Sequence, residues 1–70
     1  MNKLFLNKNI FEEAMIKLSI KAFDSIARIT LSQNKNYFIC LFHECLYDIE
    51  ETKKEFENYL IDLTNSHSVI

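Results

Sequence analysis

The alternation of apolar and polar positions along the chain predicts five elements of secondary structure. Residues 3–6 (KLFL) form a short strand candidate. From about residue 10 to residue 24, apolar side chains recur every three or four positions, which is typical of one apolar face of a helix. Asn9 is expected to cap this helix, with Glu12 in the capping-box position.

The second half of the chain predicts two further strands and a helix. Residues 26–32 (IARITLS) alternate between apolar and polar side chains, as in a half-buried strand. Residues 36–44 (NYFICLFHE) are apolar on both sides, which favours a strand covered on both faces. Asp48 is expected to cap the second helix, with Glu51 in the capping-box position. Residues 64–70 are expected to be a frayed tail.

These elements predict a small α+β domain with the chain order β-α-β-β-α. A right-handed crossover makes the first two strands parallel, and a turn at residues 32–36 (SQNKN) makes the third antiparallel to the second. The simplest result is a three-stranded sheet of order 1-3-2 with both helices on one face, a ferredoxin-like arrangement without its last strand. The first strand then has an unpaired edge. The row of Phe38, Cys40 and Phe42 becomes a candidate for the uncovered sheet face.

Length and composition indicate one domain, residues 1–70, that is associated with a partner. A chain of 70 residues buries only about 60% of its unfolded surface, so a single core is marginally stable. The hydrophobic fraction of 49% is high for so small an interior. Part of the apolar surface is therefore expected to lie against another chain, in a homodimer or a hetero-complex.

Charge and hydropathy argue against nucleic-acid and membrane partners. Residues 1–36 carry six basic and three acidic groups (+3), and residues 37–70 carry two basic and seven acidic groups (−5), which sum to the net charge of −2. No Lys/Arg cluster occurs in either half, so a nucleic-acid footprint is not expected. No apolar run approaches the roughly 20 residues of a membrane span, and no signal peptide is recognisable at the start. A cytoplasmic protein with reduced cysteines is expected.

Cys40, His43 and Cys45 lie within six residues and raise the question of a metal site. On a regular strand, Cys40 and Cys45 point to opposite faces, and only His43 shares a face with Cys45. A bulge near Glu44 would realign them, with His67 as a possible fourth zinc ligand. The simpler interpretation makes Cys40 a small apolar residue of the core or of an interface. Neither a metal nor a cofactor is expected.

Catalysis finds little support in the sequence. The chain has no glycine, so it has no glycine-rich phosphate loop. The carboxylates of the second helix, among them Glu50, Glu51, Glu55 and Glu57, lie on a face expected to be solvated. No pattern places a nucleophile beside a base. The chain is therefore expected not to be an enzyme.

The open edge of the first strand suggests peptide binding instead. An extended peptide can add to such an edge through main-chain hydrogen bonds, with alternate side chains giving selectivity. The alternative is that the same edge pairs with a second copy of the chain. The edge residues are Lys3, Leu4, Phe5 and Leu6. Phe38 and Phe42 are interpreted as either core residues or part of the partner surface.

The stretches IFEEAMIKLSIKAFDSIARITLSQNKNYFICLF and KKEFENYLIDLTNS resemble HxsD, the small protein of the His-Xaa-Ser peptide-modification systems. The resemblance covers roughly residues 10–65. The family helix carries a motif of the form Phe-x-Asn-x-Leu-Leu-x-Asp. The residues of this chain that resemble it are Phe56, Asn58, Leu60, Ile61 and Asp62, with the aspartate one position earlier than in the motif. The chain departs from the family in the glycine-free turn QNKN and in the ending LTNSHSVI, where the family continues with Leu-Arg and a further helix.

The resemblance implies a non-catalytic partner protein that works with radical SAM enzymes on a ribosomally made precursor peptide. Such a protein would present the peptide rather than modify it. Asn58 and Asp62, one helical turn apart, would offer a joint polar surface to the enzyme. An alternative of another class is a small inhibitor or antitoxin-like protein that blocks a larger protein through its acidic second helix.

Overall fold

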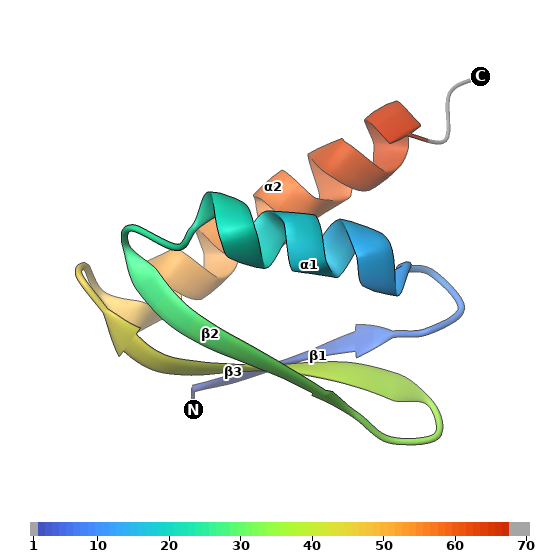
Figure 1. Ribbon diagram of the computed structural model, residues 1–70, viewed down its shortest axis with the longest axis horizontal. Coiled ribbons are helices and arrows are strands. Elements are labelled where there is room, and N and C mark those ends of the chain that lie inside the picture. The colour runs from blue at the N-terminus through green and yellow to red at the C-terminus, as the bar shows by residue number, and fades with distance from the viewer. Residues whose placement is uncertain (1, 68–70) are drawn as a thin grey trace.

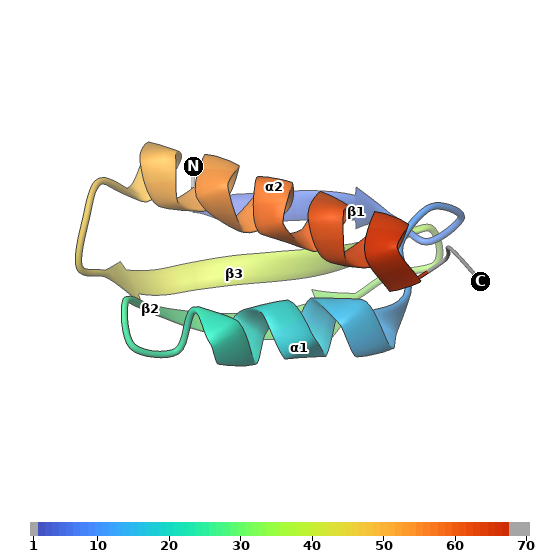
Figure 2. The same ribbon diagram turned by 90° about the horizontal axis from the view of Figure 1, so that it is seen from above.

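The computed structural model describes residues 2–67 and confirms the small α+β domain (Figure 1). The elements are β1 (Lys3–Asn7), α1 (Glu13–Ala22), β2 (Ala27–Gln33), β3 (Tyr37–Cys45) and α2 (Ile49–His67). Both β1 and β2 pair antiparallel with the central β3, which gives the sheet order β1-β3-β2. Both helices cover one face of the sheet, with α2 running beside β1 and α1 beside β2 (Figure 2). No helix among the described residues is long and apolar enough to cross a bilayer.

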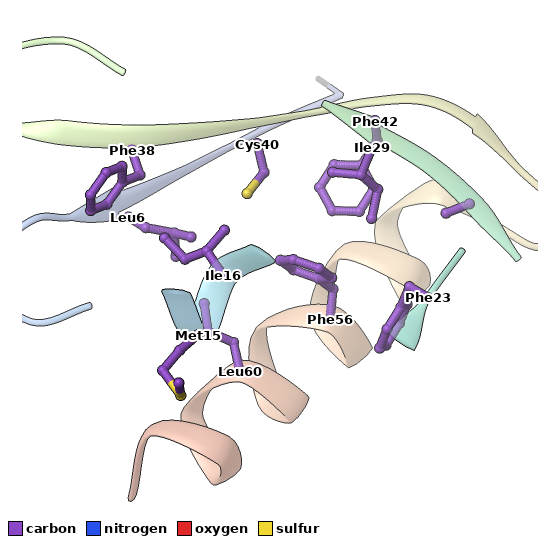
Figure 3. Close-up of a cluster of buried hydrophobic side chains, with 11 residues drawn as sticks. Leu6, Met15, Ile16, Phe23, Ile29, Phe38, Cys40, Phe42, Phe56 and Leu60 are labelled. Atoms are coloured by element: carbon purple, nitrogen blue, oxygen red, sulfur yellow. The ribbon is translucent and has the colours of Figure 1, made fainter. Parts of the chain in front are cut away.

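An aromatic cluster at the centre of the core joins the helices to the sheet. The Phe56 side chain of α2 is fully buried and lies edge-on to Phe42 of β3, with ring centroids 5.5 Å apart. The Phe56 ring also lies edge-on to Phe23, which follows α1, with ring centroids 5.3 Å apart. Leu6, Ile16, Cys40 and Leu60 complete the most deeply buried part of the cluster (Figure 3). Because Phe56 contacts both the sheet and the end of α1, it holds the two layers in place.

The row of Phe38, Cys40 and Phe42 faces the helices, so its assignment to an uncovered sheet face is wrong (Figure 3). All three side chains are buried. The register places Leu6 opposite Phe38 and Ile29 opposite Phe42, which gathers the apolar rows of three strands on one side. Burying this side removes the two phenylalanine rings of β3 from water. This gives a larger hydrophobic free energy than burying the other row of β3 would give. The other row of β3, Tyr37, Ile39 and Leu41, lies on the opposite face of the sheet.

The first helix starts later than the predicted residue 10, and Asn9 does not cap it. Asn7 Oδ1 accepts a hydrogen bond from the Asn9 N–H at 2.7 Å, and the Asn7 carbonyl accepts one from the Ile10 N–H at 3.0 Å. These bonds hold the chain in a turn after β1. The N-cap position falls on Glu12, whose side chain makes no capping hydrogen bond.

The start of α2 agrees with the sequence prediction, and its end does not. Asp48 Oδ2 accepts the Glu51 N–H at 3.1 Å, as expected of an N-cap residue. The helix continues through His67, so a frayed tail from residue 64 is wrong for residues 64–67. Residues 68–70 of the predicted tail lie outside the described residues.

Candidate functional site

The hydrogen-bond pattern between β1 and β3 decides which backbone groups of β1 remain free. The Phe42 N–H donates to the Asn2 carbonyl at 2.8 Å, and the Lys8 N–H donates to the Asn36 carbonyl at 3.1 Å. Bonded and non-bonded pairs alternate along an antiparallel ladder, so the even-numbered residues of β1 point their backbone groups at β3. The outward-pointing residues are Lys3, Phe5 and Asn7.

The turn after β1 uses part of this outer edge. The Asn7 carbonyl already accepts hydrogen bonds from the N–H groups of Ile10 and Phe11, both at 3.0 Å. Lys3 and Phe5 therefore offer both their N–H and their C=O to an incoming strand. Lys3 and Phe5 are two positions apart, which is the spacing at which a strand directs its backbone groups to one edge. This edge can therefore pair with one short peptide strand.

An apolar surface continues from this edge across the uncovered face of the sheet. We name it the open-face patch, and it consists of Phe5, Tyr37, Ile39 and Leu41. The Phe5 ring is 50% exposed and lies edge-on to Tyr37, with centroids 6.0 Å apart. Ile39 is directly opposite Phe5 in the sheet register, and Leu41 is opposite Lys3. A strand added to β1 would place every second side chain beside this patch.

Helix α2 borders the edge on the opposite side of the sheet. Figure 2 shows α2 running alongside β1. Glu55 lines a depression with Ile26 on the side of α2 that faces the end of α1. The helical period places Lys53 and Glu57 on the other flank, towards β1, and both are half-buried. Side chains of a bound strand that point to the helix side would therefore lie beside Glu57 and beside Lys53, which is ion-paired with Glu50 at 3.7 Å.

The remaining residues predicted for the site lie in two places, the core and the outer side of α2. Leu4 is half-buried and packs against the core, whereas Leu6 is almost fully buried with an exposed fraction of 1%. Phe38 and Phe42 lie within the core, so a partner-binding role for these two is wrong for this fold. Both side chains belong to the row of β3 that points towards the helices and is covered by them.

Asn58 and Asp62 are exposed on α2 and are not brought together with the β1 edge. Both lie on the side of α2 that faces away from the sheet, because they are half a helical turn from the buried Phe56 and Leu60. Asp62 lines a shallow depression together with Tyr59. The structure thus presents two separate candidate surfaces.

A bulge in β3 changes the arrangement of the two cysteines. Arg28 pairs with Glu44 whereas Ile29 pairs with Phe42, which leaves His43 as an extra residue on β3. The extra residue shifts the alternation by one position, so Cys40 and Cys45 both pack on the helix side. The expectation that they point to opposite faces is therefore wrong.

His43 lies on the other side of the sheet from both cysteines. It is exposed, and its Nε2 is 2.8 Å from Thr30 Oγ1. The bulge thus separates His43 from the two thiols instead of collecting the three groups as metal ligands. Among the side chains that the structure describes, those of residues 2–66, no group of three or more histidine, cysteine or acidic side chains could hold a metal ion.

Cys40 is expected to be chemically inert in the folded protein. It is fully buried, and burial raises the pKa of its thiol from 9.0 to about 12. Iodoacetamide at pH 8 should therefore alkylate Cys45 and leave Cys40 unmodified, which peptide mass spectrometry would show. Because the folded pKa is raised, the folded state loses stability as the pH rises from 9 towards 12.

Replacement by serine provides the matched comparison. Cys40→Ser should cost about 1–3 kcal/mol of unfolding free energy, because the hydroxyl is buried without a partner provided for it. Cys45→Ser should cost less, since Cys45 is only half-buried. Equal alkylation of both thiols, or one bound zinc per chain that is lost with Cys40→Ser, would contradict this interpretation.

The fold and the edge together define a class: a small α+β domain whose sheet offers free backbone groups beside an uncovered apolar face. Comparison of the chain with protein-family models, with curated proteins and with solved structures gives no match. The relation to HxsD stays a prediction from Phe56, Asn58 and the neighbouring motif residues. The placement of Tyr37, Ile39 and Leu41 on the uncovered face was not predicted from the sequence, although their alternation along residues 36–44 is visible there.

Proposed function

We propose that this protein is a non-catalytic peptide-binding module that presents a ribosomally made precursor peptide to a radical SAM maturation enzyme. The observation that supports it best is the outer edge of β1, where Lys3 and Phe5 have both backbone groups directed away from β3. The family resemblance in the sequence supplies the kind of peptide and the kind of enzyme.

The peptide binds as a fourth strand beside β1. Its main chain exchanges hydrogen bonds with Lys3 and Phe5, which gives affinity without regard to sequence. One set of alternate side chains packs on the open-face patch and favours apolar residues. The other set points to the helix side, beside Lys53 and Glu57, and favours polar residues. The chain on both sides of this short segment stays available to the enzyme.

The outer face of α2 is the proposed contact for the enzyme. Asn58 and Asp62 are exposed there, and the helical period directs both side chains away from the sheet. A peptide on β1 therefore does not cover them. This separation allows one small domain to hold peptide and enzyme at the same time.

The acidic character of the same face favours the second candidate function, an inhibitor or antitoxin-like protein. Glu51, Glu55 and Asp62 are exposed on α2, with Lys54 among them. Such a surface suits docking to a basic region of a larger protein, where charge complementarity speeds association. Under this alternative the β1 edge has no role in binding.

Substitution of Phe5 by proline tests the proposed function. Proline at position 5 removes an N–H that points outward, so the bonds between β1 and β3 are kept and the peptide loses a donor. The affinity for the leader segment of a precursor peptide encoded beside the gene should fall about tenfold or more, which corresponds to about 1.4 kcal/mol or more. Fluorescence anisotropy with the labelled leader measures this loss.

Phe5→Val is the matched control, because it keeps the donor and has a side chain suited to strands. It should bind with a much smaller loss. If folded Phe5→Pro binds the leader as tightly as the parent chain, the β1 edge is not the site. Radical SAM genes beside this one would support the proposal, whereas a toxin or nuclease gene in that position would support the alternative.

A further inference from the structure

The sheet has a second free edge, on β2, which the order β1-β3-β2 leaves at the other side of the molecule (Figure 1). The Asn34 N–H donates to the Tyr37 carbonyl at 2.9 Å, so Asn34 belongs to the bonded set that faces β3. By the same alternation, Thr30 and Ser32 face β3 and the residues between them face outward. The outward residues are Ile29, Leu31 and Gln33. Among residues 2–67, none bonds to their outward N–H and C=O groups.

We infer that this edge pairs antiparallel with β2 of a second copy, around a two-fold axis at Leu31, to give a continuous sheet across the dimer. In this register the backbone of Leu31 bonds to Leu31 of the partner copy, and Ile29 bonds to Gln33. The β2 edge has one more fully available residue than β1, where the turn occupies the Asn7 carbonyl. Of the two edges, β2 is therefore the better template for a second chain.

Most side chains that face each other across the axis are alike in polarity, the exception being Ile29 opposite Gln33 of the second copy. On the helix side, half-buried Leu31 meets Leu31 of the partner copy. On the open side, the hydroxyls of Thr30 and Ser32 stand opposite one another, and Arg28 faces Asn34. No like charges are opposed along the strand. A two-fold interface requires this kind of self-complementarity, since one surface serves both copies.

Helix α1 adds a charged pair above the same edge. Figure 3 shows Met15 beside Leu60 of α2, and Ile16 directed at the sheet. Each residue turns the helix by about 100°, so Lys17 points away from α2, over the outer edge of β2. Glu13 lies one turn earlier and forms an ion pair with Lys17 at 3.2 Å.

The position of this ion pair along α1 matches the two-fold axis. The Ala27 N–H donates to the Phe23 carbonyl at 2.9 Å, which joins the end of α1 to the start of β2. Leu31 is about 13 Å further along the strand. The same distance back along α1 is about nine residues, which reaches Ala14. Glu13 and Lys17 therefore flank the axis, and each meets the oppositely charged residue of the second copy.

Sedimentation equilibrium of the full chain tests the dimer. The parent protein should sediment with twice the 8.3 kDa chain mass, and Lys17→Glu should weaken dimerisation about tenfold or more by gathering four carboxylates at the axis. The double variant Glu13→Lys/Lys17→Glu restores alternating charges and should recover most of the affinity. A monomeric parent protein at tens of micromolar, or a Lys17→Glu variant with unchanged dimerisation, would overturn the inference.

Proline substitutions identify the edge independently. Leu31→Pro removes an outward donor at the axis and should give a folded monomer, whereas Phe5→Pro at the β1 edge should remain dimeric. The reverse result would place the second copy on β1 and overturn the inference. If Leu31→Pro fails to fold by circular dichroism, the loss with Lys17→Glu and the recovery in the double variant decide the question.

Discussion

Phe56→Ala is expected to remove a large part of the protein's free energy of unfolding. Its ring is fully buried and lies edge-on to both Phe23 and Phe42, so truncation empties the contact between α1, α2 and the sheet. Phenylalanine-to-alanine changes in a core cost about 3–5 kcal/mol. A domain of 70 residues has a total stability of about 3.5–10 kcal/mol. Thermal and urea unfolding followed by circular dichroism measure the loss.

Phe5→Ala is the control for the loss of an aromatic ring. Phe5 is half exposed on the open sheet face, so its truncation should cost about 1.5 kcal/mol or less. A Phe56→Ala variant with the same small loss as Phe5→Ala would show that Phe56 is not at the centre of the core. Because the two changes remove the same atoms, the difference between them reports mainly the burial of the ring, with a smaller part from the helix and strand preferences of alanine.

Leu4→Pro is expected to abolish the fold, although the neighbouring Phe5→Pro should preserve it. The Leu4 N–H points at β3, opposite Cys40, so proline removes a ladder hydrogen bond and leaves a carbonyl of β3 without its donor. The unsatisfied group costs about 1–3 kcal/mol. Loss of half-buried Leu4 from the core adds to this. Circular dichroism and proteolysis with thermolysin distinguish the folded from the unfolded variant.

The comparison of positions 4 and 5 tests the register as well as stability. Adjacent N–H groups on a strand point to opposite edges, so the two prolines have opposite consequences only if the register is correct. An unfolded Phe5→Pro together with a folded Leu4→Pro would mean that β1 is paired one residue out of step. The site at Lys3 and Phe5 would then be wrong as well.

The elements and their order follow from local signals in the sequence. Alternation along residues 26–32 is enough to predict a strand with Ala27, Ile29 and Leu31 on one side, because the side chains of any strand alternate. Asp48 is enough to predict the start of the second helix, because capping involves neighbouring residues only. The 1-3-2 sheet is then the simplest arrangement that the right-handed crossover and the short hairpin allow.

The candidate site depends on pairings between distant segments, and no local pattern contains them. Both rows of β3 are apolar, and the choice of Phe42 rather than Leu41 for the core is made by Phe56, Leu6 and the other residues that meet it. The bulge at His43 is not marked by any local pattern either. The length of β3 fits a regular strand, and the extra residue becomes visible only when β2 is aligned beside it.

The free backbone groups are the clearest case of this dependence. Every non-proline residue carries the same N–H and C=O, so composition and periodicity say nothing about which of them are used. The pairing of β1 and β2 with the central strand leaves Phe5 outward on one edge and Leu31 outward on the other. Side-chain pattern therefore predicts the architecture from local geometry, whereas backbone availability follows from the three-dimensional pairing of strands, because a hydrogen bond in a sheet always joins two segments.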